Sequence, residues 1–262
     1  MQEVFGLVWY NSVMQRMLGK KPPRIDVRSP VLDSLAVSTL PEPPASIPVP
    51  AAKWTALGND TVGDCTCAMV LHQVQAWNAA KGIQIYPDRN CAISLYEKFG
   101  YIPGDPATDQ GAVELDVVQY WMKIGVAVTD MGAIDKLDGY AVVNQGDSQR
   151  IKQCIDVFGG VLLGLAMPIS AQRQMVWDVV STPNGAPGSW GGHAVPIIAY
   201  DDVGPYCISW GEIIQMTWTF LAQYADEAYA PLSIDRLARN ESWSALVQQI
   251  KDLSGTIDYG NS

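Results

Sequence analysis

Positive charge is scarce in this sequence. Its 262 residues include 17 lysines and arginines against 27 aspartates and glutamates, for a formal net charge of −10. The densest basic stretch is Lys20-Lys21 with Arg24 nearby. Binding to nucleic acid depends on a basic face that neutralises phosphates, so we expect no nucleic-acid partner. An acidic balance of this kind is typical of a soluble protein.

Long apolar runs and a leader-like N-terminus are also missing. Although 48% of the residues are hydrophobic, no run of about 18 apolar residues occurs, so no membrane span is predicted. The short apolar stretch at 4–10 follows Glu3 and precedes the basic residues, which is the wrong order for a secretory signal peptide. The chain is long enough to bury a large core, as one domain or as two lobes that share a cleft.

The sequence has few cysteines and two histidines, His72 and His193. The five cysteines are an odd number and are scattered along the chain, at Cys65, Cys67, Cys91, Cys154 and Cys207. This pattern favours free thiols in a reducing compartment, with one disulfide in an oxidising compartment as the alternative.

Proline is concentrated in one segment. Residues 21–50 hold 8 of the 17 prolines, and such a segment forms neither a regular helix nor a central strand. We interpret residues 1–45 as an extended arm that lies across the protein, with a link to a partner or a pro-segment as alternatives. The main domain is predicted over 46–235, followed by a C-terminal helix and tail over 236–262.

Apolar spacing and turn residues predict the remaining elements. Helices are expected over 66–78, 92–99, 112–124, 148–157, 217–229 and 241–253. Strands are expected over 161–167, 193–200, 206–210 and 212–216. The first half is therefore helical and the second half is mostly strand, which predicts an α+β fold with two segregated parts.

Cys65 and His193 stand out as a catalytic pair. Cys65 directly precedes the predicted helix 66–78, and His193 opens the predicted strand 193–200. A nucleophilic thiol acts as the thiolate, which a helix N-terminus and a nearby imidazole both favour. An early cysteine and a late histidine that only folding brings together are typical of one large class of cysteine hydrolases. A cleft between the two parts would unite them.

Five motifs in this order resemble the papain-like cysteine peptidases, over residues 46 to 220. They are the domain start Ser46-Ile47-Pro48 with Trp54, the nucleophile loop Asn59–Cys65, the glycine segment Asp109-Gln110-Gly111-Ala112, the base strand Gly192-His193-Ala194-Val195 and the run Ser209-Trp210-Gly211. The loop pattern Gly-Asn-Asp-x-x-Gly-Asp-Cys also resembles distant relatives encoded by tailed bacteriophages. The resemblance implies a papain-like two-lobed fold, with a buried central helix in one lobe and an antiparallel sheet in the other.

The resemblance also implies roles for single residues. Cys65 would be the nucleophile and His193 the general acid/base. The Asn59 amide, in the place of the family's glutamine, would hold the oxyanion together with the Cys65 N–H. Trp210 would cover the histidine. Substrate would lie along Gly63, Asp64, Gly111, Gly192 and Trp210, and neither a metal nor an organic cofactor is implied.

The third member of the triad is the main departure from the family. Aligned on the Trp-Gly pair, Ile208 stands where the family has an orienting asparagine, and its side chain forms no hydrogen bond. A register shift of one residue would put Ser209 there instead. Asp201 or Asp202 would serve if the turn folds back, and the site otherwise has no orienting residue. Asp64 is a second departure, because a carboxylate beside the thiol raises the thiol pKa.

Other conspicuous residues have ordinary explanations. His72 lies about 10 Å along the predicted helix from Cys65, so we expect a structural role. Cys65, Cys67 and His72 lack the spacing of a zinc site. Asp109 is expected to be a helix N-cap or a turn residue rather than a catalytic residue, and Asp226-Glu227 is expected on the solvated face of the predicted helix 217–229.

These observations predict a cysteine peptidase or amidase that acts on a peptide or amide substrate through an acyl-enzyme. It would be phage-encoded and located in the host cytoplasm or the virion. The alternative is a weakly active or inactive structural protein of a phage particle, with virion neighbours bound by the arm. A Cys65 covered by the arm, or Ile208 facing His193, would favour the alternative. An open cleft with Ser209 touching His193 would favour the enzyme. An acyl transferase on the same scaffold is a third reading.

Overall fold

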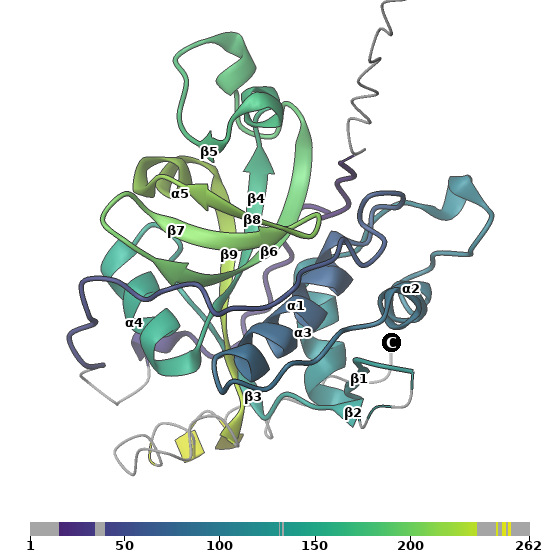
Figure 1. Cartoon of the computed structure of the whole chain (residues 1–262), viewed down its shortest axis with the longest axis horizontal. Helices are drawn as coiled ribbons and strands as arrows, with labels where there is room; N and C mark the ends of the chain where they lie inside the picture. Colours follow the sequence, from purple (N-terminus) through teal and green to yellow (C-terminus); the bar gives the residue numbers. More distant parts are fainter. Residues whose placement is uncertain are drawn as a thin grey trace, which may run out of the picture.

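The computed structural model describes residues 16–34, 40–130, 132 and 134–234, together with 245, 248–249 and 251–252. Most of the predicted helix 241–253 lies outside these residues, as does the start of the predicted arm. The described chain has an α+β fold, with helices α1 to α3 on one side and a large sheet on the other (Figure 1).

Three helices form the helical side. The central helix α1 (Cys65–Ala79) is buried at every residue except Asn78, because it lies between the sheet and the other two helices. Its partners are α2 (Arg89–Glu97) and α3 (Glu114–Lys123), and a small ribbon of β1 (Val126–Ala127) and β2 (Ile134–Asp135) follows them. A helix that is enclosed on all sides carries apolar residues all round, as α1 does.

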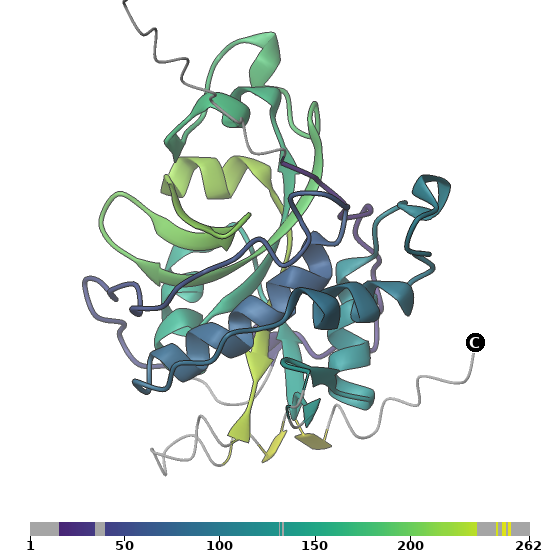
Figure 2. The ribbon, with the colours of Figure 1, turned by 45° about the vertical axis from the view of Figure 1, so that its right-hand side comes forward.

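A seven-stranded sheet forms the other side, in the order β3-β9-β4-β6-β7-β8-β5. The bounds are β3 Gly139–Val142, β9 Ala225–Leu232, β4 Val161–Met167, β6 Gly191–Tyr200, β7 Pro205–Ser209, β8 Glu212–Met216 and β5 Val176–Trp177. Neighbouring strands are antiparallel except β5 and β8. Helices α4 (Ser148–Phe158) and α5 (Trp218–Tyr224) pack against the face that α1 leaves free (Figure 2).

Most predicted elements are confirmed, several within one or two residues. One is wrong: the predicted helix 217–229 ends at Tyr224, and the chain continues as β9. This strand runs between β3 and β4, so its backbone is hydrogen-bonded on both edges. Pairing of that kind outweighs local helix propensity. Consequently Glu227 does not lie on a solvated helix face but is buried at 7% exposure.

The proline-rich arm crosses both sides of the molecule. Lys20 pairs in parallel with Ala112 at the start of the helical side, and its N–H donates to Gly192 O of β6. Further along, Val31 pairs with Val142, and Ile47 pairs with Tyr200. The first described part of the arm is purple in Figures 1 and 2, where it passes between α3 and the sheet. We call residues 16–21 the cleft segment.

Candidate active site

Cys65 is the first residue of α1, at the end of a tight loop. The loop turns at Leu57 and Gly58, whose φ angles are 57° and 112°, and the N–H groups of Thr61 and Val62 both donate to Gly58 O. Cys65 itself is 1% exposed. Its place at a helix N-terminus is one that stabilises a thiolate.

His193 lies on β6, and only one of its ring nitrogens is bonded. Nε2 is 2.7 Å from Ser209 Oγ, whereas Nδ1 has no hydrogen-bond partner among the described residues. The ring stacks on Trp210, with centroids 4.5 Å apart and planes 8° from parallel. Nδ1 is therefore the nitrogen that is free to exchange a proton.

The turn between β7 and β8 explains why Ser209 meets His193. Ser209 pairs with Glu212 across a two-residue turn, in which Trp210 and Gly211 have φ angles of 50° and 82°. Positive φ at both central residues is the geometry that closes a tight hairpin. This turn places Ser209 at Nε2 and Trp210 over the imidazole.

The other predicted orienting residues lie elsewhere. Ile208 packs in a separate apolar cluster with Ala76 and Ile198. The Asp201 carboxylate accepts hydrogen bonds from Val203, Gly204, Tyr206 and Gln215, and so holds the turn at the far end of β6. Asp202 is exposed in that turn.

Folding brings Cys65 close to the residue that follows His193. The backbone of that residue, Ala194, lies near enough to the Cys65 thiol to lower its pKa. The backbone of Gly19, in the cleft segment, acts on the pKa of the same thiol in the same direction. The predicted pair from the two parts of the fold thus lies at their junction, and the arm covers it.

The cleft segment fills this junction with main chain. Met17 donates its N–H to Asn59 O at 3.1 Å and accepts from Trp210 Nε1 at 3.0 Å. Gly19 O accepts from Ala112 N at 2.9 Å, and Lys21 N donates to Ala112 O at 2.9 Å. Residues from both sides therefore hold the segment as they would hold an extended peptide.

Three of the predicted substrate-binding glycines line this segment. A Cβ atom on Gly63 would lie 2.8 Å from Leu18 O, and a Cβ on Gly111 or Gly192 would overlap the carbonyl of Gly19 or Lys20. The close approach of the two backbones therefore requires glycine at all three positions.

Burial favours the neutral forms of both Cys65 and His193. It raises the pKa of Cys65 to about 12, with Asp64 adding to the effect. It lowers the pKa of His193 to about 3, and the Arg16 guanidinium adds to the effect. A thiol and an unprotonated imidazole form no ion pair, so burial disfavours the reactive thiolate.

Asn59 and Asp64 lie in the loop rather than along the cleft segment. Asn59 Nδ2 donates to Val62 O at 3.2 Å, which braces the loop and uses one of the amide donors. Asp64 is 0% exposed, and both carboxylate oxygens lack hydrogen-bond partners among the described residues. Burial raises its pKa well above the usual range, with Arg89 and Asn59 offsetting this only in part. Burial without hydrogen-bond partners thus favours the protonated, neutral form of Asp64.

A hydrogen-bonded brace that the sequence did not reveal holds the glycine segments. Asp109 accepts the N–H of Gly63 at 3.0 Å and the hydroxyl of Tyr96 at 2.7 Å. The same hydroxyl accepts the N–H of Gly111 at 2.6 Å. Asp109 thus follows the short 3-10 helix Pro106–Thr108 and ties the loop before Cys65 to α2.

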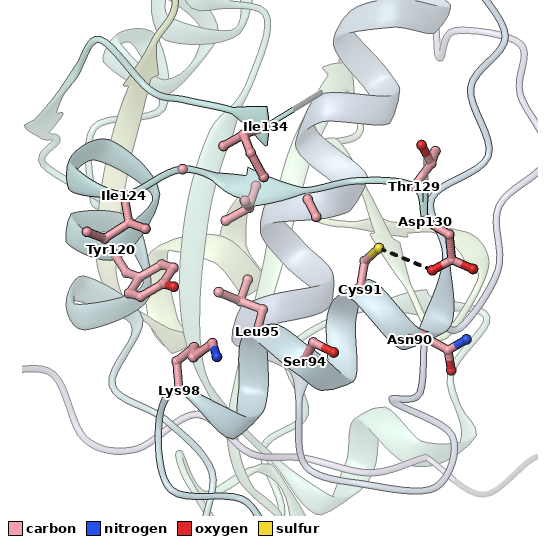
Figure 3. A pocket seen from close by; sticks show the side chains of 13 residues that line it. Asn90, Cys91, Ser94, Leu95, Lys98, Tyr120, Ile124, Thr129, Asp130 and Ile134 are labelled. Carbon is pink, nitrogen blue, oxygen red and sulfur yellow. Dashed lines mark hydrogen bonds between the residues drawn. The ribbon is translucent and has the colours of Figure 1, made fainter. Parts of the chain in front are cut away.

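Neither Cys91 nor the second histidine, His72, belongs to a comparable cysteine–histidine site. A pocket of about 390 Å³ lies between α2 and β1 and is lined in part by Cys91 (Figure 3). Cys91 Sγ lies 4.0 Å from Asp130 Oδ1. Burial and the Asp88 and Asp130 carboxylates raise the pKa of Cys91, which opposes a thiolate. His72 Nε2 lies 2.8 Å from Thr55 O, and burial lowers the pKa of His72 to about 4, in keeping with the predicted structural role.

Within the described part of the chain, no cluster of three or more histidine, cysteine, aspartate or glutamate side chains could hold a metal ion. No described helix is both long and apolar enough to cross a membrane. All five cysteines are free thiols.

Comparison with known proteins identifies the fold. No protein-family model matches the sequence, and no curated protein matches it. Among solved structures, xylellain, a cysteine protease from Xylella fastidiosa, superimposes with a TM-score of 0.64 at 17% identity over 84% of this chain and 97% of its own. Procathepsin B from Trypanosoma congolense gives a TM-score of 0.56 at 12% identity, covering 83% and 86% of the two chains. A Carica candamarcensis cysteine protease in complex with E-64 gives 0.54 at 16% identity, covering 72% and 99%.

These similarities confirm the predicted papain-like α+β fold. At identities of 12% to 17% they establish the fold alone. The arm covers Cys65, which was the expectation for a structural protein. Ser209 contacts His193, and Ile208 packs elsewhere, which were the expectations for an enzyme.

Proposed function

We propose that this protein is a papain-like cysteine peptidase or amidase. The observation that carries the proposal is His193, with Nε2 fixed by Ser209 and Nδ1 unpartnered among the described residues. His193 directly precedes Ala194, whose backbone lowers the pKa of the Cys65 thiol. A buried polar atom without a hydrogen-bond partner destabilises a purely structural core. A general base, in contrast, needs a nitrogen that is free to accept a proton. Cys65 attacks the carbonyl carbon, His193 takes and returns the proton, and water then hydrolyses the acyl-enzyme.

The oxyanion would be held by the Cys65 N–H and by the second N–H of the Asn59 amide. One Asn59 donor is already used on Val62 O, so the amide enters the reaction from a braced position. Gly63, Gly111 and Gly192 would take the substrate backbone in the place where the cleft segment now lies. Trp210 would exclude water from the imidazole.

The covered state implies that the cleft segment leaves before catalysis. Because the segment buries both members of the pair, it holds them neutral, and its departure exposes them to water and lets the ion pair form. A phage origin, with a location in the host cytoplasm or the virion, remains part of the proposal and rests on the resemblance of the nucleophile loop.

A single substitution in the arm provides the test. A Cβ on Gly19 would overlap the backbone carbonyl of Gly63, so Gly19→Ala expels the cleft segment. Gly146→Ala is the matched control, because its Cβ would meet only Asn144 Oδ1, at 3.5 Å. Labelling with iodoacetamide from pH 4 to 9, with assignment by mass spectrometry, follows each cysteine separately.

We expect Cys65 of Gly19→Ala to react rapidly near pH 5–6, and His193→Ala in the same background to abolish that reactivity. Cys91 and Cys154 serve as internal controls, because burial raises the pKa of both. A Cys65 that reacts only above about pH 8, like an ordinary thiol, would refute the enzyme and leave a structural protein of the papain-like fold.

A further inference from the structure

The cleft segment places one charged side chain in a buried acidic pocket. Lys20, next to the glycine at Cys65, has a side chain that is 1% exposed. Its Nζ lies 2.9 Å from Glu227 Oε1, 3.1 Å from Asp226 Oδ2 and 3.1 Å from Lys21 O. An ammonium has three N–H donors, so these three oxygens match it in number.

The sheet explains why this pocket adjoins the catalytic pair. Ala194 on β6 pairs with Gly164 on β4, and Gly164 pairs with Glu227 on β9. Paired residues on adjacent strands point to the same face, so Glu227 lies two strands from the residue that follows His193. The glycine between them leaves the space that Lys20 fills, because a Cβ there would overlap Lys20 Cε.

A third acid extends the pocket from the helical side. Glu114, the first residue of α3, is 0% exposed, and both its carboxylate oxygens lack hydrogen-bond partners among the described residues. It lies two residues after Ala112, which pairs with Lys20, so the start of α3 brings it to the same pocket. Glu227 is also held by the Tyr229 hydroxyl at 2.7 Å, so its carboxylate is fixed in position.

We propose that this pocket of Glu114, Asp226 and Glu227, with Gly164 as its floor, binds a lysine side chain of the substrate, within two residues of the bond that Cys65 attacks. The proposal rests on the proposed hydrolase function, and Lys20 is the intramolecular stand-in for that side chain. Without a bound ammonium, the three acids would be left as unpaired carboxyl groups in a largely buried pocket. A basic side chain offsets the free-energy cost of that burial.

The pocket's shape favours lysine over arginine. The lysine stem lies directly against the Gly164 backbone, and its single nitrogen contacts both carboxylates. A guanidinium is planar and carries five donors in a fixed fork, so it would leave N–H groups unsatisfied in a closed site. A neutral side chain of the same length would leave Glu227 without its counter-ion.

Peptide binding to Gly19→Ala tests the pocket without any chemistry at Cys65. The probe is a synthetic peptide with the sequence of residues 16–24, and two analogues carry norleucine or arginine in place of Lys20. Isothermal titration at pH 7 should show norleucine binding at least about tenfold more weakly than lysine, since a charge-assisted pair is lost. Arginine should fall between them. Equal affinity of the lysine and norleucine peptides would overturn the proposal.

Variants of the pocket locate the effect. Glu227→Gln should remove most of the preference for lysine while keeping an acceptor for the Tyr229 hydroxyl, whereas Glu97→Gln, an exposed acid on α2, should not. If Glu97→Gln matched Glu227→Gln, the preference would come from overall charge, and the proposal would fail.

A second measurement uses the full chain and does not depend on displacing the arm. Lys20→Met should raise the labelling rate of Cys65 about tenfold at pH 8.5, where an ordinary thiol reacts, and Lys21→Met should not. Equal rates in the two variants would contradict the pocket. Because neither readout requires an activated thiol, the pocket can stand if the hydrolase proposal fails, and the hydrolase can stand if the pocket fails.

Discussion

Nε2 of His193 and Oγ of Ser209 lie 2.7 Å apart, and this is the one hydrogen bond that the imidazole makes among the described residues. A hydroxyl can both donate and accept a hydrogen bond. The Ser209 contact therefore fixes the position of the imidazole ring but does not by itself select the tautomer of His193. If Nε2–H donates to Oγ, then Nδ1 is the unprotonated nitrogen and serves as the base toward Cys65.

Ser209→Ala tests whether this contact orients the imidazole. In the Gly19→Ala background, we expect Cys65 alkylation near pH 6 to fall about tenfold, which is the worth of one buried hydrogen bond. The pH profile is the decisive readout, because loss of the imidazolium would shift it toward that of a free thiol. Ser94→Ala, on the exposed side of α2, is the control. An unchanged profile would remove Ser209 from the site.

Asp64→Asn tests the protonation of the buried acid. If Asp64 is neutral, asparagine replaces it at nearly equal size and charge, and the pH profile of Cys65 alkylation should stay within about 0.3 units. A charged Asp64 would oppose the thiolate, so its removal would move the profile to lower pH. Such a shift, measured in the Gly19→Ala background, would show that the carboxylate is ionised.

Trp210→Phe tests how the cleft segment is held. The variant keeps an aromatic ring over His193 but loses the Nε1–H bond to Met17 O. We expect Cys65 labelling at pH 8.5 to rise about fivefold, as for the loss of one hydrogen bond near the surface. Trp177→Phe is the matched control, because Trp177 Nε1 has no hydrogen-bond partner in the described chain. A similar rise in both variants would point to loosened packing instead.

Acid should release the cleft segment. The pKa of His193 is about 3 when covered, against an ordinary 6.5, so protonation opposes covering. The covered state is thus favoured above about pH 6.5 and loses stability, by about tenfold per unit, as the pH falls from there toward 3.

Labelling with 2,2′-dipyridyl disulfide at pH 7, 6 and 5 measures this release. The rate at Cys65 in the natural chain, divided by the rate in Gly19→Ala, isolates the contribution of the arm from the intrinsic reactivity of the pair. The ratio should rise as the pH falls. A constant or falling ratio would contradict acid release.

Local patterns predicted the elements that local interactions determine. The helix at Cys65 and the strand ending at Met167 follow from apolar spacing and turn residues, and both are confirmed. The strand at Glu227 could not be predicted, because its conformation comes from pairing with β3 and β4, which are distant in sequence.

The same distinction applies to the site. Cys65 and His193 carry local motifs, and so does Ser209, although only the turn at Trp210 decides that the serine and not Ile208 meets the imidazole. Lys20 gave no signal beyond a lysine pair in a proline-rich arm. The role of Lys20 depends on a pocket assembled from α3, β4 and β9. These elements are distant in sequence, so no local pattern predicts their contact with Lys20.

The covalent link between the arm and its cleft has a kinetic consequence. A tethered occupant has an effective concentration on the order of millimolar, whatever the dilution of the protein. A free peptide with the same contacts would need to reach that concentration to compete as an equal. The affinity of a free peptide for the cleft therefore cannot alone govern access to Cys65. Access depends on events that change the tethered arm itself, such as cutting, pulling or protonating it.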